Sequence, residues 1–235
     1  MNKPIIFRIF ISMEIKHEAF NTILHKDYGQ TFIRLIEKRN LNDLLKEIDE
    51  ISDMSQDYGY TDSEIEDDVK LGKYKFIGDL FEIFAEVFFL QFKSDNRIGI
   101  FDYLPVESED DNGVDGFGKN IEGVPATIQI KFRGNPTYRL KERDLKQFAY
   151  QSIVNYDVDH NRSDNMIVFT NCEGLHWYTE ANVFNNKIKT INGKMISTLI
   201  DNNEGFWVTF ADIVDTTIKN KGIDKLYEIY KDIKK

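Results

Sequence analysis

The stretch that organises this chain is GVDGFGKNIEGVPATIQIKFR, residues 113–133. Its second half, Ala126–Phe132, alternates polar and apolar side chains, a pattern that predicts a β-strand. Gln129 and Lys131 share one face of that strand, and the other face is apolar. Asp115 precedes the strand, separated from it by a short turn-rich excursion. We therefore expect an aspartate, an amide and a lysine to lie close together.

The composition limits the classes of protein that this chain can belong to. With 235 residues, 41% of them hydrophobic, it can bury one sizeable core with a small appended domain. No window approaches the ~18 apolar residues of a membrane span, so we expect no membrane partner. The formal net charge of −10 means that any surface binding nucleic acid must be local.

Cysteine usage and the first residues bear on the compartment. The single cysteine, Cys172, excludes an internal disulfide and every Cys-rich zinc site, which favours a reducing cytoplasm. The four histidines are scattered and indicate no histidine metal site. The start, MNKPIIFRIFISM, resembles a secretory signal, but Arg8 interrupts its apolar run. A first strand, or an upstream extension before a start at Met13, is the preferred interpretation.

Apolar periodicity divides the rest of the chain into helices and strands that alternate in its middle part. This order predicts an α/β fold with a mixed central sheet. We expect three parts: a mostly helical region over residues 1–70, an α/β core over 71–180, and a hairpin and helices packing on the core over 181–235. The expected elements are a helical pair in Glu18–Met54, an acidic connection over Gln56–Val69, a helix over Lys75–Phe92, a strand over Arg97–Leu104, an acidic loop over Glu107–Asn112, a helix over Lys141–Asn155, a buried strand over Met166–Thr170 with Leu175–Tyr178 as its edge neighbour, a hairpin turning at Asn192-Gly193, and helices over Trp207–Lys219 and Ile223–Ile233.

The apolar helix over Lys75–Phe92 carries two acids, Glu82 and Glu86, one turn apart. Two like charges on a mostly buried helix are costly unless a cation lies beside them. The alternative for Glu86 is that its side chain reaches solvent.

A local reversal of charge follows the central strand. Residues 131–146 contain six basic and two acidic side chains, a net charge of +4 in an otherwise acidic chain. This segment is the best candidate for a surface that contacts phosphate. Its basic residues after Lys131 are Arg133, Arg139, Lys141, Arg143 and Lys146.

The polar residues around the central strand suit a hard divalent cation. Mg²⁺ takes oxygen ligands, commonly one or two carboxylates with water and phosphate. Asp115 supplies one carboxylate, Glu82 could supply another, and the Gln129 amide and the Ile130 carbonyl are within plausible reach. Lys131 would then orient a water or stabilise the charge that grows on a phosphate.

These residues carry a family resemblance. Glu82 on an apolar helix, Val114-Asp115-Gly116, and Gln129-Ile130-Lys131 after a step of 14 residues resemble the PD-(D/E)XK restriction-endonuclease-like nuclease superfamily. The Mrr-type subgroup, in which Gln-x-Lys replaces Glu-x-Lys, is the most similar. The continuation is also similar, in Lys131-Phe132-Arg133, in Asp144-Leu145 with Phe148, and in Val168–Asn171. The resemblance covers Gly72–Gly174.

The resemblance implies a restriction-endonuclease-like core and a metal-dependent DNA endonuclease that uses Mg²⁺ or Mn²⁺. It makes Asp115 the metal carboxylate, Gln129 the neutral ligand, Lys131 the catalytic lysine and Glu82 the helix acid. Two features depart from the family: Val114 stands where a proline often precedes the aspartate, and the Gln-x-x-x-Tyr helix of the exonuclease branch is absent. DNA is the implied partner, with a homo-oligomer and a helicase or other protein that supplies specificity as further possibilities.

Other interpretations of these residues stay open. Asp115 before a glycine is often a turn residue, Gln129 and Lys131 could form a solvent-facing strand edge, and Glu82 could cap a helix or pair with an arginine. At the level of function, the alternatives are a catalytically silent nuclease-fold module that binds DNA or joins a larger assembly, and a protein that acts only through protein contacts.

Overall fold

The structure is a computed structural model that describes residues 13–25, 30–53, 66–106, 113–159, 162, 164–176 and 188–221. For residues 25, 30 and 66–71 it describes the backbone alone. Predictions for the first twelve residues, the acidic loop Glu107–Asn112 and the helix Ile223–Ile233 lie outside the described residues.

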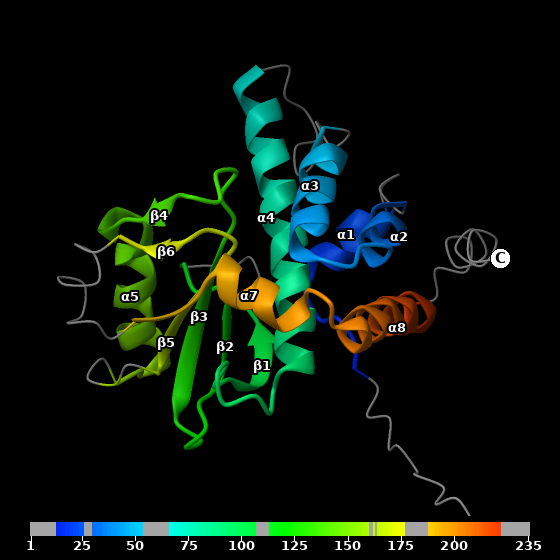
Figure 1. Ribbon diagram of the computed structural model, residues 1–235. Coiled ribbons are helices and arrows are strands. Elements are labelled where there is room, and N and C mark those ends of the chain that lie inside the picture. The colour runs from blue at the N-terminus through cyan, green and yellow to red at the C-terminus, as the bar shows by residue number, and fades with distance from the viewer. Residues whose placement is uncertain are drawn as a thin grey trace, which may run out of the picture.

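A five-stranded mixed sheet lies at the centre of the fold (Figure 1), with strand order β1-β2-β3-β5-β7. The first three strands form an antiparallel meander, and β5 and β7 run parallel to β3. A separate pair, β4 and β6, runs parallel beside it. The strands are β1 (Phe101–Pro105), β2 (Gly116–Lys119), β3 (Pro125–Lys131), β4 (Arg139–Leu140), β5 (Met166–Thr170), β6 (Gly174–Leu175) and β7 (Ile188–Ile191).

Helices cover both faces of the sheet, which is why five consecutive residues of β3 are buried. Helix α4 lies along one face and α5 along the other, while α1, α2, α3 and α8 lie on the side of α4 away from the sheet (Figure 1). The helices are α1 (Ala19–His25), α2 (Gln30–Ile36), α3 (Leu41–Ser52), α4 (Glu66–Gln91), α5 (Glu142–Tyr156), α7 (Gly193–Ile200) and α8 (Glu204–Asn220).

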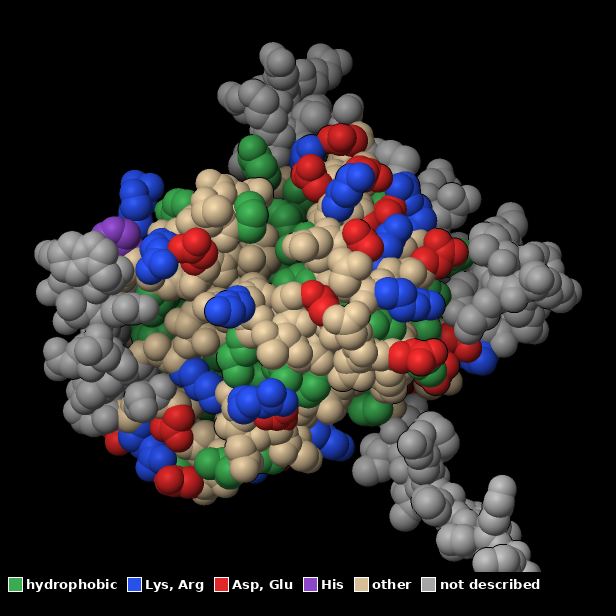
Figure 2. Space-filling model, viewed as in Figure 1, with side chains coloured by type: hydrophobic (Ala, Val, Ile, Leu, Met, Phe, Trp, Pro, Cys, Tyr) green, Lys and Arg blue, Asp and Glu red, His purple; other side chains and the backbone are tan. Residues whose placement is uncertain are grey.

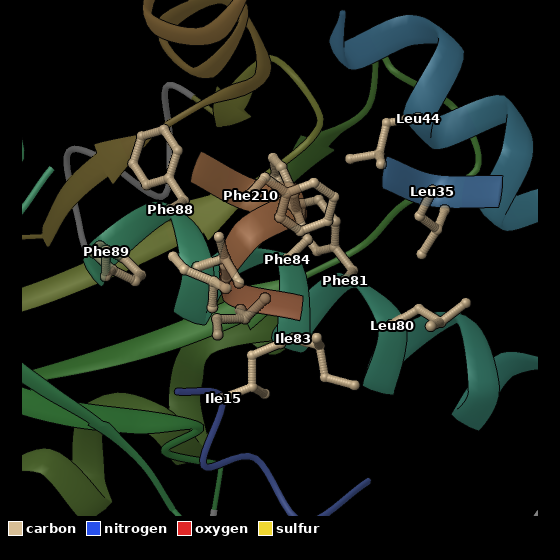
Figure 3. Close-up of a cluster of buried hydrophobic side chains, with 14 of the residues drawn as sticks. Ile15, Leu35, Leu44, Leu80, Phe81, Ile83, Phe84, Phe88, Phe89 and Phe210 are labelled. Carbon is tan, nitrogen blue, oxygen red and sulfur yellow. The ribbon is translucent and has the colours of Figure 1, made fainter. Parts of the chain in front are cut away.

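One large apolar cluster joins regions that are far apart in the sequence. Figure 3 shows Ile15 from the N-terminal segment, Leu44 from α3 and Phe210 from α8 around the α4 side chains, which include Phe84 and Phe88. Phe169 of β5 packs on the same phenylalanines of α4, with ring centroids 6.3 and 5.1 Å away. The N-terminal helices, the sheet and α8 therefore share a core, and α4 runs without a break through the boundary expected near residue 70.

Several predicted elements are confirmed, and others are wrong. The strand Met166–Thr170 has the predicted bounds, and α5 and α8 lie close to theirs. The N-terminal pair of helices is three helices, and α4 begins at Glu66 rather than Lys75. The short strand β6 pairs with β4, so Leu175 is not an edge neighbour of β5.

The hairpin predicted at Asn192-Gly193 is also wrong. Strand β7 ends at Ile191 and α7 begins at Gly193, with the Asn192 side chain accepting a hydrogen bond from the Met195 N–H at 3.0 Å as the helix N-cap. Asparagine before glycine suits a turn and also a helix start, and pairing of β7 with β5 selects the second.

None of the helices in the described part of the chain has the length and apolar character that a membrane crossing requires.

Candidate active site

Asp115 is fixed against the central strand by hydrogen bonds. Its N–H donates to the Ile128 carbonyl at 3.0 Å, and its carboxylate accepts from the Ile130 N–H at 2.5 Å. The side chain is buried. The hydrogen bonds therefore place the buried Asp115 beside the strand that carries Gln129 and Lys131.

The amide of Gln129 has one satisfied end and one unsatisfied end. Its Nε2 donates to the Gly113 carbonyl at 2.8 Å, whereas its Oε1 is buried and has no hydrogen-bond partner among the described residues. Because a carbonyl can only accept, the amide nitrogen must face Gly113. The unpartnered atom is therefore an oxygen, the kind of atom that a hard cation binds.

Lys131 ends β3 and lines a cavity of about 680 Å³ between α4 and the end of that strand. Glu82 lies in the same cavity, as do Lys73 and Arg133. Lys73 pairs with Asp53 at 2.5 Å, but the Lys131 ammonium pairs with none of the carboxylates that the structure describes. The predicted lysine and helix acid thus share one solvent-accessible hollow.

Glu82 has a partner that the sequence pattern missed. The Nε2 of His17 lies 2.8 Å from the Glu82 carboxylate, and the imidazole is almost fully buried. The two residues are 65 positions apart, so no local pattern relates them. The arginine partner considered for Glu82 is instead a histidine from the N-terminal segment.

Glu86 holds the same segment on α4. Its carboxylate accepts hydrogen bonds from the backbone N–H groups of Lys16 and His17 at 2.7 and 3.0 Å. The side chain is only 1% exposed, so the alternative in which Glu86 reaches solvent is wrong. The expected compensation of the two acids comes from one imidazole and two backbone donors.

Burial and the contacts between these groups shift the pKa values of His17 and Glu86. Burial lowers the pKa of His17, but the hydrogen bond to Glu82 and the charges of Glu82, Asp79 and Glu86 outweigh burial and raise it above 6.5. Burial raises the pKa of Glu86, and the two backbone donors only partly offset that effect. Both groups therefore hold a proton more tightly than they would in the unfolded chain.

The predicted phosphate-contacting segment is partly neutralised. Arg133 lies 3.3 Å from Asp144 and over the Tyr138 ring, and Arg139 lies 2.8 Å from Glu173. Burial alone would raise the pKa of Asp144, but hydrogen bonds from Lys141 and Tyr138 and the Arg133 charge lower it.

The remaining predicted contacts, Lys141, Arg143 and Lys146, are exposed at the start of α5 and form no ion pair with the residues that the structure describes. Elsewhere the charges alternate in sign: Figure 2 shows acidic and basic side chains intermixed over α3, where Lys46 pairs with Glu50. Lys141, Arg143 and Lys146 are therefore the basic residues of the predicted segment that no ion pair among the described residues engages, although Glu142 and Asp144 lie between them.

The residues at the site suit a weakly held divalent cation. Within the described ranges, no group of three or more His, Cys, Asp or Glu side chains is arranged to hold a metal ion. The donor set is instead one carboxylate, Asp115, and the unpartnered amide oxygen of Gln129. Glu82 lies in the cavity that Lys131 lines, at the end of the same strand.

No family model matches the sequence, and a search of curated proteins found no significant match.

Proposed function

We propose that this protein is a metal-dependent DNA endonuclease with a restriction-endonuclease-like core. The observation that carries the proposal is the convergence on β3: Asp115 is bonded to the Ile130 N–H, and among the described residues the Gln129 amide oxygen has no hydrogen-bond partner and Lys131 has no ion pair. A mixed sheet flanked by helices carries these residues, as the family resemblance implies.

Asp115 and Gln129 would hold Mg²⁺ or Mn²⁺, with Glu82 as a further acid in the same neighbourhood. The cation supplies activation of a water and stabilisation of negative charge on the phosphate. Lys131 lines the cavity, where its ammonium group can neutralise a non-bridging phosphate oxygen. Lys141, Arg143 and Lys146 would contact the DNA backbone outside the cavity.

The neutral Gln129 has a consequence for metal affinity. A site with one carboxylate and one amide lacks the charge that holds Mg²⁺ tightly in a free protein. We infer that DNA phosphate completes the ligand set, so the metal binds together with the substrate. Calorimetric titration of Mg²⁺ with and without duplex tests this reading, and tight binding to the free protein would contradict it.

Plasmid cleavage tests the proposal. Wild-type protein with millimolar Mg²⁺ or Mn²⁺ should nick or linearise supercoiled plasmid, and Lys131→Ala and Asp115→Asn should each lower the rate about 10²–10³-fold. Asparagine keeps an oxygen for the Ile130 N–H, so that variant removes charge with little change in folding. Lys119→Ala is the matched control, because Lys119 is an exposed lysine on β2 of the same sheet.

Cleavage that survives both Lys131→Ala and Asp115→Asn would overturn the proposal.

A second candidate is a nuclease-fold module that binds DNA without cleaving it. Two observations favour it: Glu82 is already engaged by His17, and the described residues contain no three-acid metal cluster. Footprinting separates the candidates, since a binding module would protect DNA from a second nuclease yet leave it intact with every metal tried.

A further inference from the structure

The cavity beside Lys131 has a wall on α4 that the proposed mechanism leaves unused. Tyr74, Gly78 and Glu82 follow one another at intervals of four residues, so they lie on one face of the helix, and all three line the cavity. Glu82 belongs to the proposed metal site, whereas Tyr74 lies eight residues away, about 12 Å along the helix axis. The cavity therefore extends beyond the reacting groups.

Tyr74 presents a large aromatic surface at the far end of this wall. The residue is 67% exposed, and within the part of the chain that the structure describes its ring contacts no other aromatic ring and its hydroxyl forms no hydrogen bond. A single exposed aromatic residue needs no explanation by itself. Tyr74 differs because it borders a cavity of about 680 Å³, a volume within the range of pockets that hold small organic ligands.

Gly78 keeps the wall open between Tyr74 and Glu82. A Cβ atom at Gly78 would meet no atom of the described residues within 4 Å, so packing does not require a glycine there. Glycine inside a helix costs about 0.5–1 kcal/mol relative to alanine. Close approach of a ligand to the backbone is a use of glycine that offsets this cost, and the open space beside Gly78 lies within the cavity.

Basic side chains line the same cavity. They are Lys73, Lys131 and Arg133, against the two acids Asp49 and Glu82, so the lining has a net charge of +1 in a chain of net charge −10. Lys73 and Arg133 are partly exposed, and their carboxylate partners do not line the cavity. Cationic side chains beside an exposed aromatic ring are the combination that binds single-stranded nucleic acid, through its phosphates and through the face of a base.

We propose that Tyr74 and Gly78 form a subsite for one unpaired nucleotide of the DNA, whose base stacks on the Tyr74 ring while its strand passes over Gly78 toward Lys131. Both faces of a base inside a duplex are covered by its neighbours, so only an unpaired or flipped base can stack on a side chain. The substrate class is therefore DNA with an unpaired segment, such as an overhang or a flap. Negative supercoiling promotes unpairing, so supercoiled plasmid also supplies such bases.

The inference rests on the proposed function, because it takes Lys131 to lie at the scissile phosphate. Tyr74 is about 12 Å from Glu82, more than the 3.4 Å rise between stacked bases. The stacked base therefore flanks the scissile phosphate and does not carry it. Tyr74 is a residue that selects the substrate, and it takes no part in the reaction.

Binding in EDTA tests the subsite without cleavage. The probes are a short fluorescent oligothymidine and a strand of equal length with abasic sugar-phosphates, and fluorescence anisotropy at low salt gives each Kd. Tyr74→Ala should weaken oligothymidine binding about 5–100-fold and leave binding of the abasic strand unchanged, because only the stacking partner is lost. Tyr74→Phe should bind as wild type does, because it keeps the ring.

Gly78→Gln tests the open wall. Glutamine favours a helix more than glycine does, so the thermal midpoint should equal or exceed that of wild type. The added side chain fills the space beside the backbone, so binding of both strands should weaken.

Tyr150→Ala is the matched control, because Tyr150 is a 62% exposed tyrosine on α5, which covers the other face of the sheet (Figure 1). This variant should bind both strands as wild type does.

The outcomes separate the subsite from the proposed function. If Tyr74→Ala binds oligothymidine as tightly as wild type, or if wild type does not prefer oligothymidine to the abasic strand, the subsite is wrong and the nuclease proposal stands on plasmid cleavage alone. If the Tyr74 and Gly78 variants behave as expected but wild type cleaves no plasmid with Mg²⁺ or Mn²⁺, the subsite stands and the nuclease proposal fails. A wild type that binds duplex and no single strand overturns the subsite alone.

Discussion

Substitution of Glu86 should release the N-terminal segment from α4. The carboxylate is buried and accepts the backbone N–H groups of Lys16 and His17. Glu86→Gln keeps one acceptor oxygen and turns an NH₂ group toward the other donor, so one of the two hydrogen bonds must be lost. Glu86→Leu keeps the side-chain volume and removes both acceptors.

The size of the effect follows from the cost of an unsatisfied donor. Leaving a buried backbone N–H without a partner costs about 1–3 kcal/mol. The hydrogen bond at His17 is buried and that at Lys16 is part-buried, so water partly replaces the second. We expect Glu86→Gln to lower the free energy of unfolding by about 1–2 kcal/mol and Glu86→Leu by about 2–4 kcal/mol.

Urea denaturation at constant pH measures these changes. Glu50→Gln is the control, because the Glu50 side chain is 51% exposed and its ion pair with Lys46 should contribute under about 1 kcal/mol. Tryptic cleavage after Lys16 should also accelerate in both Glu86 variants. A Glu86→Gln protein whose unfolding free energy lies within about 0.5 kcal/mol of wild type would refute the reasoning.

Two further predictions concern pH and glycine positions. The folded-state pKa values of Glu86 and His17 are both raised, so the stability that each contributes is present below its unfolded pKa and is lost as pH rises through the folded one. Urea midpoints should therefore fall as the pH rises above 4.5, through Glu86, and again above 6.5, through His17, and a His17→Gln variant with the same slope above pH 6.5 would contradict the role of the imidazole. A Cβ at Gly193 would lie 2.2 Å from the Asn171 carbonyl oxygen, so Gly193→Ala should destabilise by about 1–3 kcal/mol. A Cβ at Gly78 in α4 would meet no atom within 4 Å, so Gly78→Ala should stabilise the protein by about 0.5–1 kcal/mol. Thermal denaturation measures both variants, and a Gly193→Ala protein more stable than the Gly78→Ala protein would contradict this reasoning.

The elements that could be predicted are those whose pattern is complete within a few residues. The alternation that placed Gln129 and Lys131 on one face lies within β3, and the apolar run Met166–Thr170 is the whole of β5. The prediction from sequence was wrong where a local motif is compatible with two structures. Asn192-Gly193 can close a hairpin or begin a helix, and the decision came from the pairing of β7 with β5.

The candidate site likewise has features that the sequence predicted and contacts that only the structure revealed. The sequence by itself determined which residue types stand on the central strand, because side-chain direction in a strand follows from the backbone period of two. Only the tertiary structure decided that His17 meets Glu82, that Glu86 holds a distant segment, and that Tyr103 lies against Gly116. The physical reason is that these contacts join residues from separate elements, and packing of the shared apolar core, rather than any local pattern, fixes the distances between such residues.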